Sequence, residues 1–177
     1  MVGVFRTPRL IARQFTPADV DDLHAICGDR RVMRYVGDGL VLARRRCAEW
    51  IDESLMDYTA RGYGAWALAV EGEAVLAGYG GIVAARRRAD PEIIYALRPG
   101  LWGRGLATEL LPALLNHGFN SCRLPRLIAT VRPENQASLR VVEKAGMHCA
   151  GEELEDEGIL MLIYALDAPP VRVNGDK

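Results

Sequence analysis

Two glycines that follow a mainly apolar segment have the spacing of an anion-binding turn. Gly103 and Gly105 lie between residues 92–98 and an apolar stripe that begins at Leu106. We expect a buried strand, a tight turn and the first turn of a helix. Backbone N–H groups at a helix start have no partner within the helix and lie at the positive end of its dipole. Since glycine has no Cβ, phosphate oxygens can approach the main chain closely, and the sequence predicts a pyrophosphate site.

Two common phosphate-binding turns do not match this stretch. A P-loop requires Lys and then Ser or Thr after its last glycine, whereas Leu106 follows Gly105 here. A dinucleotide-binding turn requires Gly or Ala where this chain has Thr108. It also requires an acidic residue about 20 positions later, and residues 125–129 contain none.

The elements that must position this turn alternate between strand-like and helix-like patterns. Thr16 and Pro17 are of the types preferred at a helix start, and Asn135 can cap a later helix. We expect strands at residues 9–15, 66–70, 75–84, 92–98, 127–131, 150–156 and 159–166. We expect helices from Thr16 to Gly28, at 41–61, from 106 to about 119 and from Asn135 to about 145. Residues 31–37 are expected to form a short turn of helix that leads into a loop.

The composition is that of one globular domain. The chain has 177 residues and a net charge of −1, so we expect neither nucleic acid nor a membrane as a partner. The amino-terminal residues lack a signal-peptide pattern, and we expect a cytoplasmic protein. The four cysteines and three histidines are scattered, which predicts no disulfide and no metal site. We expect the domain to span residues 7–167, followed by a flexible tail at 168–177.

Residues 102–109 resemble the acetyl-CoA pyrophosphate loop of the GNAT superfamily of N-acetyltransferases. That loop has Gln or Arg, two residues, Gly, one residue, and Gly or Ala. Here the corresponding positions run from Trp102 through Gly105 to Ala107. Three further segments resemble the ribosomal-protein N-acetyltransferase (RimJ/RimL-like) branch, and they are residues 7–19, 29–35 and 132–147.

The resemblance implies an α/β (α+β) fold with a mixed seven-stranded central sheet and helices on both faces. The two central parallel strands, here 92–98 and 127–131, would splay apart and admit the pantetheine arm of acetyl-CoA. The arm would pair with the backbone of Ala96, Leu97 and Arg98 and would touch Asn135 and Ser138. The pyrophosphate would rest on the amides of Gly103, Arg104, Gly105, Leu106, Ala107 and Thr108, with Arg104 able to add a charged contact.

The reaction implied is transfer of an acetyl group to a primary amine by direct attack in a ternary complex. A free α-amine has a pKa of about 8 and a lysine one of about 10.4, so a proton must be removed near neutral pH. Glu92 is the candidate base, acting through water, because family members have a carboxylate at this place. Glu153, Glu155 and water itself remain alternatives.

The candidate acid is Ser138. Many family members use a tyrosine seven residues after the motif asparagine, but this chain has Val142 there. Members of the ribosomal-protein branch are thought to use a serine three residues after that asparagine, which is Ser138 here. Because the tyrosine is missing, a non-catalytic acetyl-CoA sensor is the alternative function.

The acceptor is not fixed by the sequence. A protein amino terminus and a small-molecule amine both remain open, as does a longer acyl group. The sequence also leaves open a homodimer.

Overall fold

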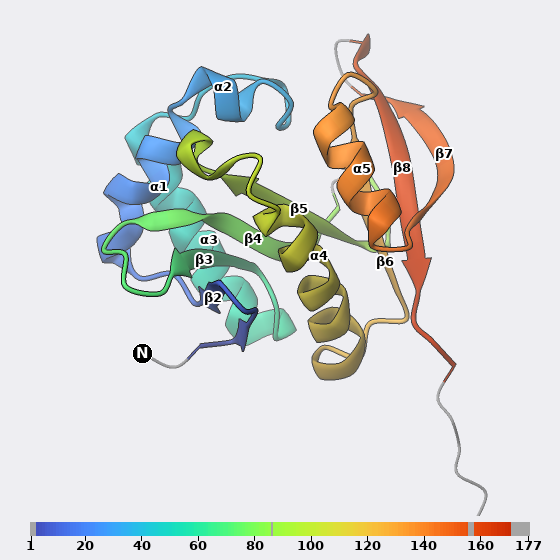
Figure 1. Ribbon diagram of the computed structural model, residues 1–177, viewed down its shortest axis with the longest axis horizontal. Helices are drawn as coiled ribbons and strands as arrows, with labels where there is room; N and C mark the ends of the chain where they lie inside the picture. Colours follow the sequence, from blue (N-terminus) through green and yellow to red (C-terminus); the bar gives the residue numbers. More distant parts are fainter. Residues whose placement is uncertain (1–2, 86, 156–157, 171–177) are drawn as a thin grey trace, which may run out of the picture.

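One mixed sheet carries the whole arrangement (Figure 1). The computed structural model describes residues 3–85, 87–155 and 158–170. Within these residues eight strands follow the order β1-β2-β3-β4-β5-β6-β8-β7. They are β1 (Phe5–Arg6), β2 (Leu10–Arg13), β3 (Ala65–Val70), β4 (Leu76–Ala84), β5 (Pro91–Leu97), β6 (Arg126–Val131), β7 (His148–Leu154) and β8 (Leu160–Asp167).

Five α-helices are found in the same residues. They are α1 (Val20–Cys27), α2 (Arg30–Met33), α3 (Arg44–Arg61), α4 (Leu106–Asn116) and α5 (Gln136–Lys144). A 3-10 turn, η1 (Pro17–Asp19), leads into α1, another, η2 (Pro99–Leu101), follows β5, and a π-helical turn, η3 (His117–Ser121), extends α4.

The expected seven strands become eight in the structure. The additional strand is β1, in which Phe5 pairs with Ala12 and Arg6 with Ile11 of β2. The Phe5 ring meets the Trp66 ring edge-on, with ring centroids 5.8 Å apart. This two-residue strand is too short for a hydrophobic period to reveal it, and its packing against the core stabilises it.

Several helix and strand limits differ from the expectation by one to three residues, among them the starts of α3 and β7. The helix expected from residue 41 begins at Arg44, because Ala43 is extended (φ −68°, ψ 152°) and Leu42 N–H donates to Cys27 O at 2.9 Å. β7 begins two residues before the expected strand at 150–156, whose last residue lies outside the described part of the chain. Residues 171–177 of the expected tail lie outside it as well.

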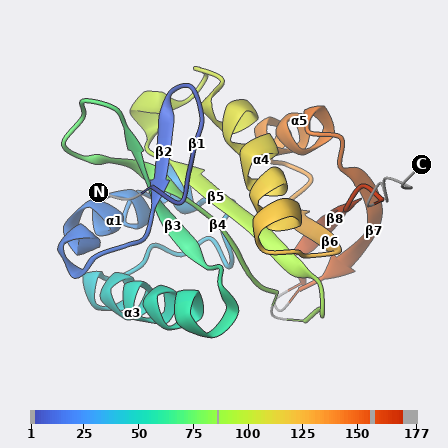
Figure 2. The ribbon, with the colours of Figure 1, turned by 90° about the horizontal axis from the view of Figure 1, so that it is seen from below.

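Helices cover both faces of the sheet, with α4 and α5 on one face and α1 and α3 on the other (Figure 2). The side chains of β3 show how one strand serves both layers. Trp66 and Leu68 are buried in the cluster with α4, whereas Ala65 and Ala67 are buried in the cluster with α1 and α3. Successive strand residues point to opposite faces, so a fully apolar strand fits only a sheet covered on both sides.

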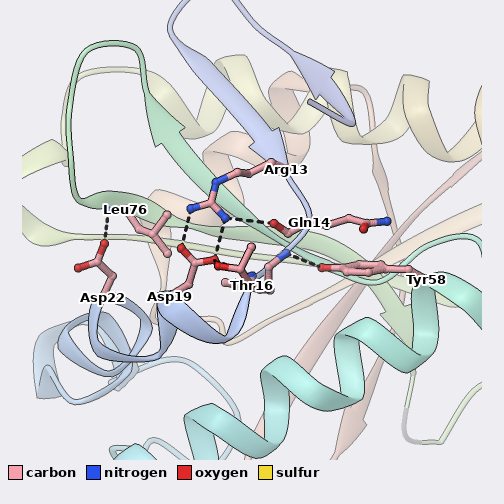
Figure 3. A network of polar contacts seen from close by, with 8 residues as sticks. Arg13, Gln14, Thr16, Asp19, Asp22, Tyr58 and Leu76 are labelled. Atoms are coloured by element: carbon pink, nitrogen blue, oxygen red, sulfur yellow. Dashed lines mark hydrogen bonds and ion pairs between the residues drawn. The ribbon is translucent and has the colours of Figure 1, made fainter. Parts of the chain in front are cut away.

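A polar network fixes the start of α1 against the sheet (Figure 3). The guanidinium of Arg13 donates to both carboxylate oxygens of Asp19, at 2.7 and 2.6 Å. Asp19 also accepts from Thr16 N–H at 2.7 Å, and Phe15 N–H donates to the Tyr58 hydroxyl at 3.3 Å. Arg13 and Asp19 are both buried, and buried charges are tolerated when they are paired and hydrogen-bonded in this way.

The central parallel strands β5 and β6 separate soon after they begin (Figure 1). Their ladder contains one registered pair, Glu92 with Ile128. By contrast, β4 and β5 pair over seven residues, from Gly78–Leu97 to Ala84–Pro91. The divergence leaves the edge of β5 that faces β6 without strand partners beyond Glu92.

Candidate active site

The glycine turn lies between β5 and α4, and its residues 102–105 are exposed to solvent. Gly103 and Gly105 have φ angles of 72° and 76°, conformations that residues with a Cβ rarely adopt. Glu109 N–H donates to Gly105 O at 3.1 Å and begins the hydrogen bonding of α4. No described side chain caps this helix start, so the N–H groups of residues 106–108 can bind an anion.

Residues before β2 hold the turn in place. The Thr7 hydroxyl donates to the Glu109 carboxylate, as does Arg9 N–H at 2.8 Å. The Arg9 guanidinium donates to Glu109 at 2.7 Å and to Arg104 O at 2.8 Å. The Arg104 side chain is exposed and forms no ion pair with a described residue. The sequence gives no sign that Arg9 and Glu109, 100 positions apart, are in contact.

The backbone of β5 presents alternate residues to the splay. Arg98 N–H donates to Ala77 O at 2.9 Å, so Arg98 and Ala96 direct their backbone groups toward β4. Residues of an antiparallel strand alternate in this respect, and Tyr95 and Leu97 therefore face β6. Leu97 O already accepts from the Trp102 indole N–H at 2.7 Å. The expected pantetheine contacts of Ala96 and Arg98 would have to compete with β4.

The start of α5 lies on the other side of the splay. The Asn135 side chain accepts from Ser138 N–H at 3.2 Å and caps the helix, as predicted from its residue type. The Ser138 hydroxyl is 2.8 Å from the Tyr95 hydroxyl, and either oxygen can be the donor. Tyr95 was not among the predicted site residues, because an aromatic residue in an apolar strand has the pattern of a core residue.

Glu92 lies where β5 and β6 still pair. Its carboxylate accepts from Thr130 N–H at 3.2 Å and from the Thr130 hydroxyl. Burial raises the pKa of Glu92, and the nearby charge of Glu155 adds to this, against the opposing hydrogen bonds from Thr130. A carboxyl group with a raised pKa is better matched to proton transfer near neutral pH than an ordinary glutamate.

The other carboxylates named as bases have different surroundings. Glu153 forms an ion pair with Arg88 at 2.5 Å, which favours a structural role on β7. Glu155 lies close enough to Glu92 to act on its pKa. The position of the usual acid, Val142, is fully buried in the cluster against which the Tyr95 ring also packs.

Glu92 and Tyr95 project from opposite faces of β5, because they are three residues apart. Tyr95 packs against the cluster of the α4 face, whereas Ile94 and Ala96 belong to the cluster of the α1 and α3 face. Glu92 shares the face of Ile94. The candidate base and the Tyr95–Ser138 pair therefore approach the splay from opposite sides of the sheet.

Two features are absent from the described part of the chain. No group of three or more His, Cys, Asp or Glu side chains among them is placed to hold a metal ion. None of the described helices is both long enough and apolar enough to cross a membrane.

A model of the acetyltransferase (GNAT) domain matches residues 9–148, which include β2, the glycine turn and Asn135. The chain belongs to the GNAT acetyltransferase family. It is an acyltransferase, as the resemblance implied, and its mixed sheet with helices on both faces is the GNAT fold. GNAT proteins bind acetyl-CoA or CoA, and the exposed glycine turn at the uncapped start of α4 fits the pyrophosphate of such a ligand.

Two relatives of this GNAT chain are similar to it over most of their lengths. Both are uncharacterised N-acetyltransferases of Bacillus subtilis (strain 168). YnaD is 28% identical over 145 residues, 82% of each chain, and YoaA is 28% identical over 175 residues, 98% of this chain and 95% of YoaA.

Solved structures share the fold. A GNAT-family acetyltransferase from Bacillus anthracis has a TM-score of 0.78 and 28% identity, covering 92% of this chain and 96% of its own. RimL, a ribosomal L7/L12 alpha-N-protein acetyltransferase in complex with coenzyme A, has a TM-score of 0.79 over 94% of this chain and 98% of its own. At 18% identity, the likeness to RimL concerns the fold alone.

Proposed function

We propose that this chain transfers the acetyl group of acetyl-CoA to a primary amine by direct attack in a ternary complex. The observation that carries the proposal is the arrangement of proton-transfer groups on the two faces of β5. Glu92 serves the side from which the amine arrives. Ser138, which is hydrogen-bonded to Tyr95, supplies a proton on the side from which the sulfur departs. Direct attack requires these two proton transfers at the two ends of the reacting centre.

The pyrophosphate binds the N–H groups of residues 103–108, where the helix dipole of α4 adds to the attraction. The pantetheine arm pairs with the edge of β5 that faces β6. The register of β4 and β5 favours Tyr95 and the N–H of Leu97 for this contact over Ala96 and Arg98. An extended ligand paired with a free strand edge gains backbone hydrogen bonds in the manner of an added strand.

The reaction then proceeds in a simple order. Glu92 accepts the proton of the amine through water, and the neutral nitrogen attacks the thioester carbonyl. The N–H groups of Tyr95 and Leu97 face the splay, and one of them stabilises the tetrahedral oxyanion. Collapse of the intermediate breaks the C–S bond, and the sulfur takes a proton from Ser138. A thiol with a pKa near 8.5 is a better leaving group when a proton is supplied.

Acceptor-dependent release of CoA thiol tests the proposal. Purified protein is mixed with acetyl-CoA and a panel of peptides with free amino termini, polyamines and amino sugars. Thiol release that depends on one of these amines, together with the acetylated amine in the mass spectrum, is the expected result. Tight acetyl-CoA binding without acceptor-dependent release would contradict the proposal and support a sensor.

A further inference from the structure

One side-chain hydrogen bond crosses the gap between β5 and the start of α5. Tyr95 comes from β5 and Ser138 from the first turn of α5, and their hydroxyl oxygens are 2.8 Å apart. Ser138 is held from its other side, because its N–H donates to the Asn135 side chain at 3.2 Å. The Tyr95 ring packs against the cluster that contains Leu97 and Val142. Two fixed elements thus define the position of the Ser138 hydroxyl.

A serine hydroxyl is a poor acid by itself. Its conjugate base is an alkoxide, which is far more basic than the thiolate that it would protonate. A phenol, with a pKa of about 10, is much closer to a thiol at about 8.5. Ser138 can therefore protonate sulfur effectively only if it receives another proton in the same step. The group within hydrogen-bond distance that can supply one is the Tyr95 hydroxyl.

We propose that Tyr95 positions Ser138 and supplies the proton that Ser138 passes to the departing sulfur. The proposal rests on the acetyl transfer proposed above and adds a residue to it. As the C–S bond breaks, its electron pair stays with sulfur, and the proton of Ser138 forms the S–H bond. The proton of Tyr95 moves to the Ser138 oxygen at the same time. The resulting phenolate regains a proton from water, so both side chains return to their starting states.

The location of Tyr95 explains how the family's tyrosine can be absent from α5. Val142, at that position, is 0% exposed and belongs to the core cluster against which Tyr95 packs. A tyrosine from the facing strand takes over the supply of the proton, and Ser138 bridges the remaining distance. Burial raises the pKa of Tyr95 and outweighs the hydrogen bond with Ser138, so the phenol keeps its proton in the resting enzyme.

A double-mutant cycle on Tyr95→Phe and Ser138→Ala tests this relay. General acid catalysis contributes about 10²- to 10⁴-fold, and we expect Ser138→Ala to lower kcat by about 10²-fold. Tyr95→Phe should lower kcat by at least about tenfold while KM for acetyl-CoA changes less than about twofold. Because both residues act in one coupled proton-transfer step, the double variant should be no slower than Ser138→Ala alone.

Tyr164→Phe is the matched control. The Tyr164 hydroxyl donates to Glu143 of the same helix at 2.9 Å, so this variant also removes a tyrosine hydroxyl bonded to α5. It should leave kcat unchanged. The solvent deuterium isotope effect adds a readout that packing does not change. Two protons move in the same step in the wild-type chain, so a plot of its kcat against the deuterium fraction of the solvent should be curved. Only one proton moves in Tyr95→Phe, so its plot should be a straight line.

Two results would overturn the relay while leaving acetyl transfer intact. One is an active wild-type chain whose kcat is unaffected by Tyr95→Phe. The other is a double variant whose reduction in kcat equals the product of the reductions in the two single variants. A wild-type chain that releases no thiol with any amine would instead overturn both the relay and the proposed function.

Discussion

The carboxylate of Glu109, in the first turn of α4, forms an ion pair with Arg9 at 2.7 Å. The same carboxylate accepts the Arg9 N–H, and the Arg9 guanidinium continues to Arg104 O at 2.8 Å. Burial acts to raise the pKa of Glu109, but the hydrogen bonds from Thr7 and Arg9 outweigh it and lower this pKa. The charged pair thus fixes the glycine turn relative to β2, which would preorganise the turn for the pyrophosphate proposed to bind there.

We expect Glu109→Gln to weaken acetyl-CoA binding about tenfold, which corresponds to about 1.4 kcal/mol. Glutamine keeps the shape of the side chain but cannot form the ion pair, so Arg9 no longer restrains Arg104. Titration calorimetry with acetyl-CoA measures the effect. Glu53→Gln, which breaks the exposed ion pair with Arg46 on α3, is the control and should bind normally. Equal affinities for the two variants would show that the pair does not preorganise the turn.

The raised pKa of Glu92 gives the rate profile a definite direction. A general base acts in its ionised form, so the rate should rise with pH through the pKa of Glu92, which lies above the ordinary value for glutamate. Glu92→Gln removes this base, and the rising limb should move to higher pH, where the ammonium group of the acceptor loses its proton to solvent without help. The measurement is kcat/KM between pH 5 and 10. An unchanged profile would assign the role to Glu155 or to water.

The raised pKa of Glu92 also predicts how the stability of the fold depends on pH. A carboxyl group whose pKa is raised by folding fits the folded chain better when it is protonated, so the fold loses stability as the pH rises through that pKa. We therefore expect Glu92→Gln to melt at a temperature equal to or above that of the wild-type chain at pH 8. The difference should vanish near pH 4, where Glu92 is protonated. A lower melting temperature at pH 8 would mean that the bonds with Thr130 outweigh the cost of burial.

Local patterns were sufficient for the parts of this fold that depend on neighbouring residues. The glycine turn, the cap by Asn135 and the alternating strands each rest on residues within one or two turns of chain. The additional strand, β1, cannot be predicted from the sequence, because the two residues Phe5–Arg6 are too few to show a hydrophobic period. The predicted start of α3 is too early, because Leu42 N–H donates to Cys27 O in a tertiary hydrogen bond and Ala43 is extended.

The features of the candidate site that the sequence does not predict are contacts between residues far apart in the chain. Tyr95 and Ser138 are 43 positions apart, and a tyrosine between apolar neighbours predicts only burial. Likewise, the indole of Trp102 gives no hint that it donates to Leu97 O. Such contacts depend on how β5 meets α4 and α5, which the hydrophobic period does not specify. The sequence therefore indicates the ligand class well and the proton path only in part.

Asp19 provides a test of how the fold holds α1 against the sheet (Figure 3). We expect Asp19→Asn to lower the free energy of unfolding at pH 7 by about 3–5 kcal/mol, because it leaves the buried Arg13 charge without its partner. Thermal and urea unfolding measure this loss. Asp57→Asn, which breaks an exposed ion pair with Arg61 on α3, is the control and should cost less than about 1 kcal/mol.

The pH dependence of the Asp19→Asn effect has a definite sign. Burial acts to raise the pKa of Asp19, but hydrogen bonds from Arg13 and Thr16 outweigh it, so this pKa lies below its usual value. A carboxyl group whose pKa is lowered by folding stabilises the fold at pH values above its unfolded-state pKa of about 3.9. This stabilisation is lost as the pH falls through the pKa of the folded state. The difference between the wild-type chain and Asp19→Asn should therefore be constant from pH 5 to 8 and shrink below about pH 4. A difference that stays constant down to pH 2 would mean that lost packing, and not the ionised Asp19, accounts for it.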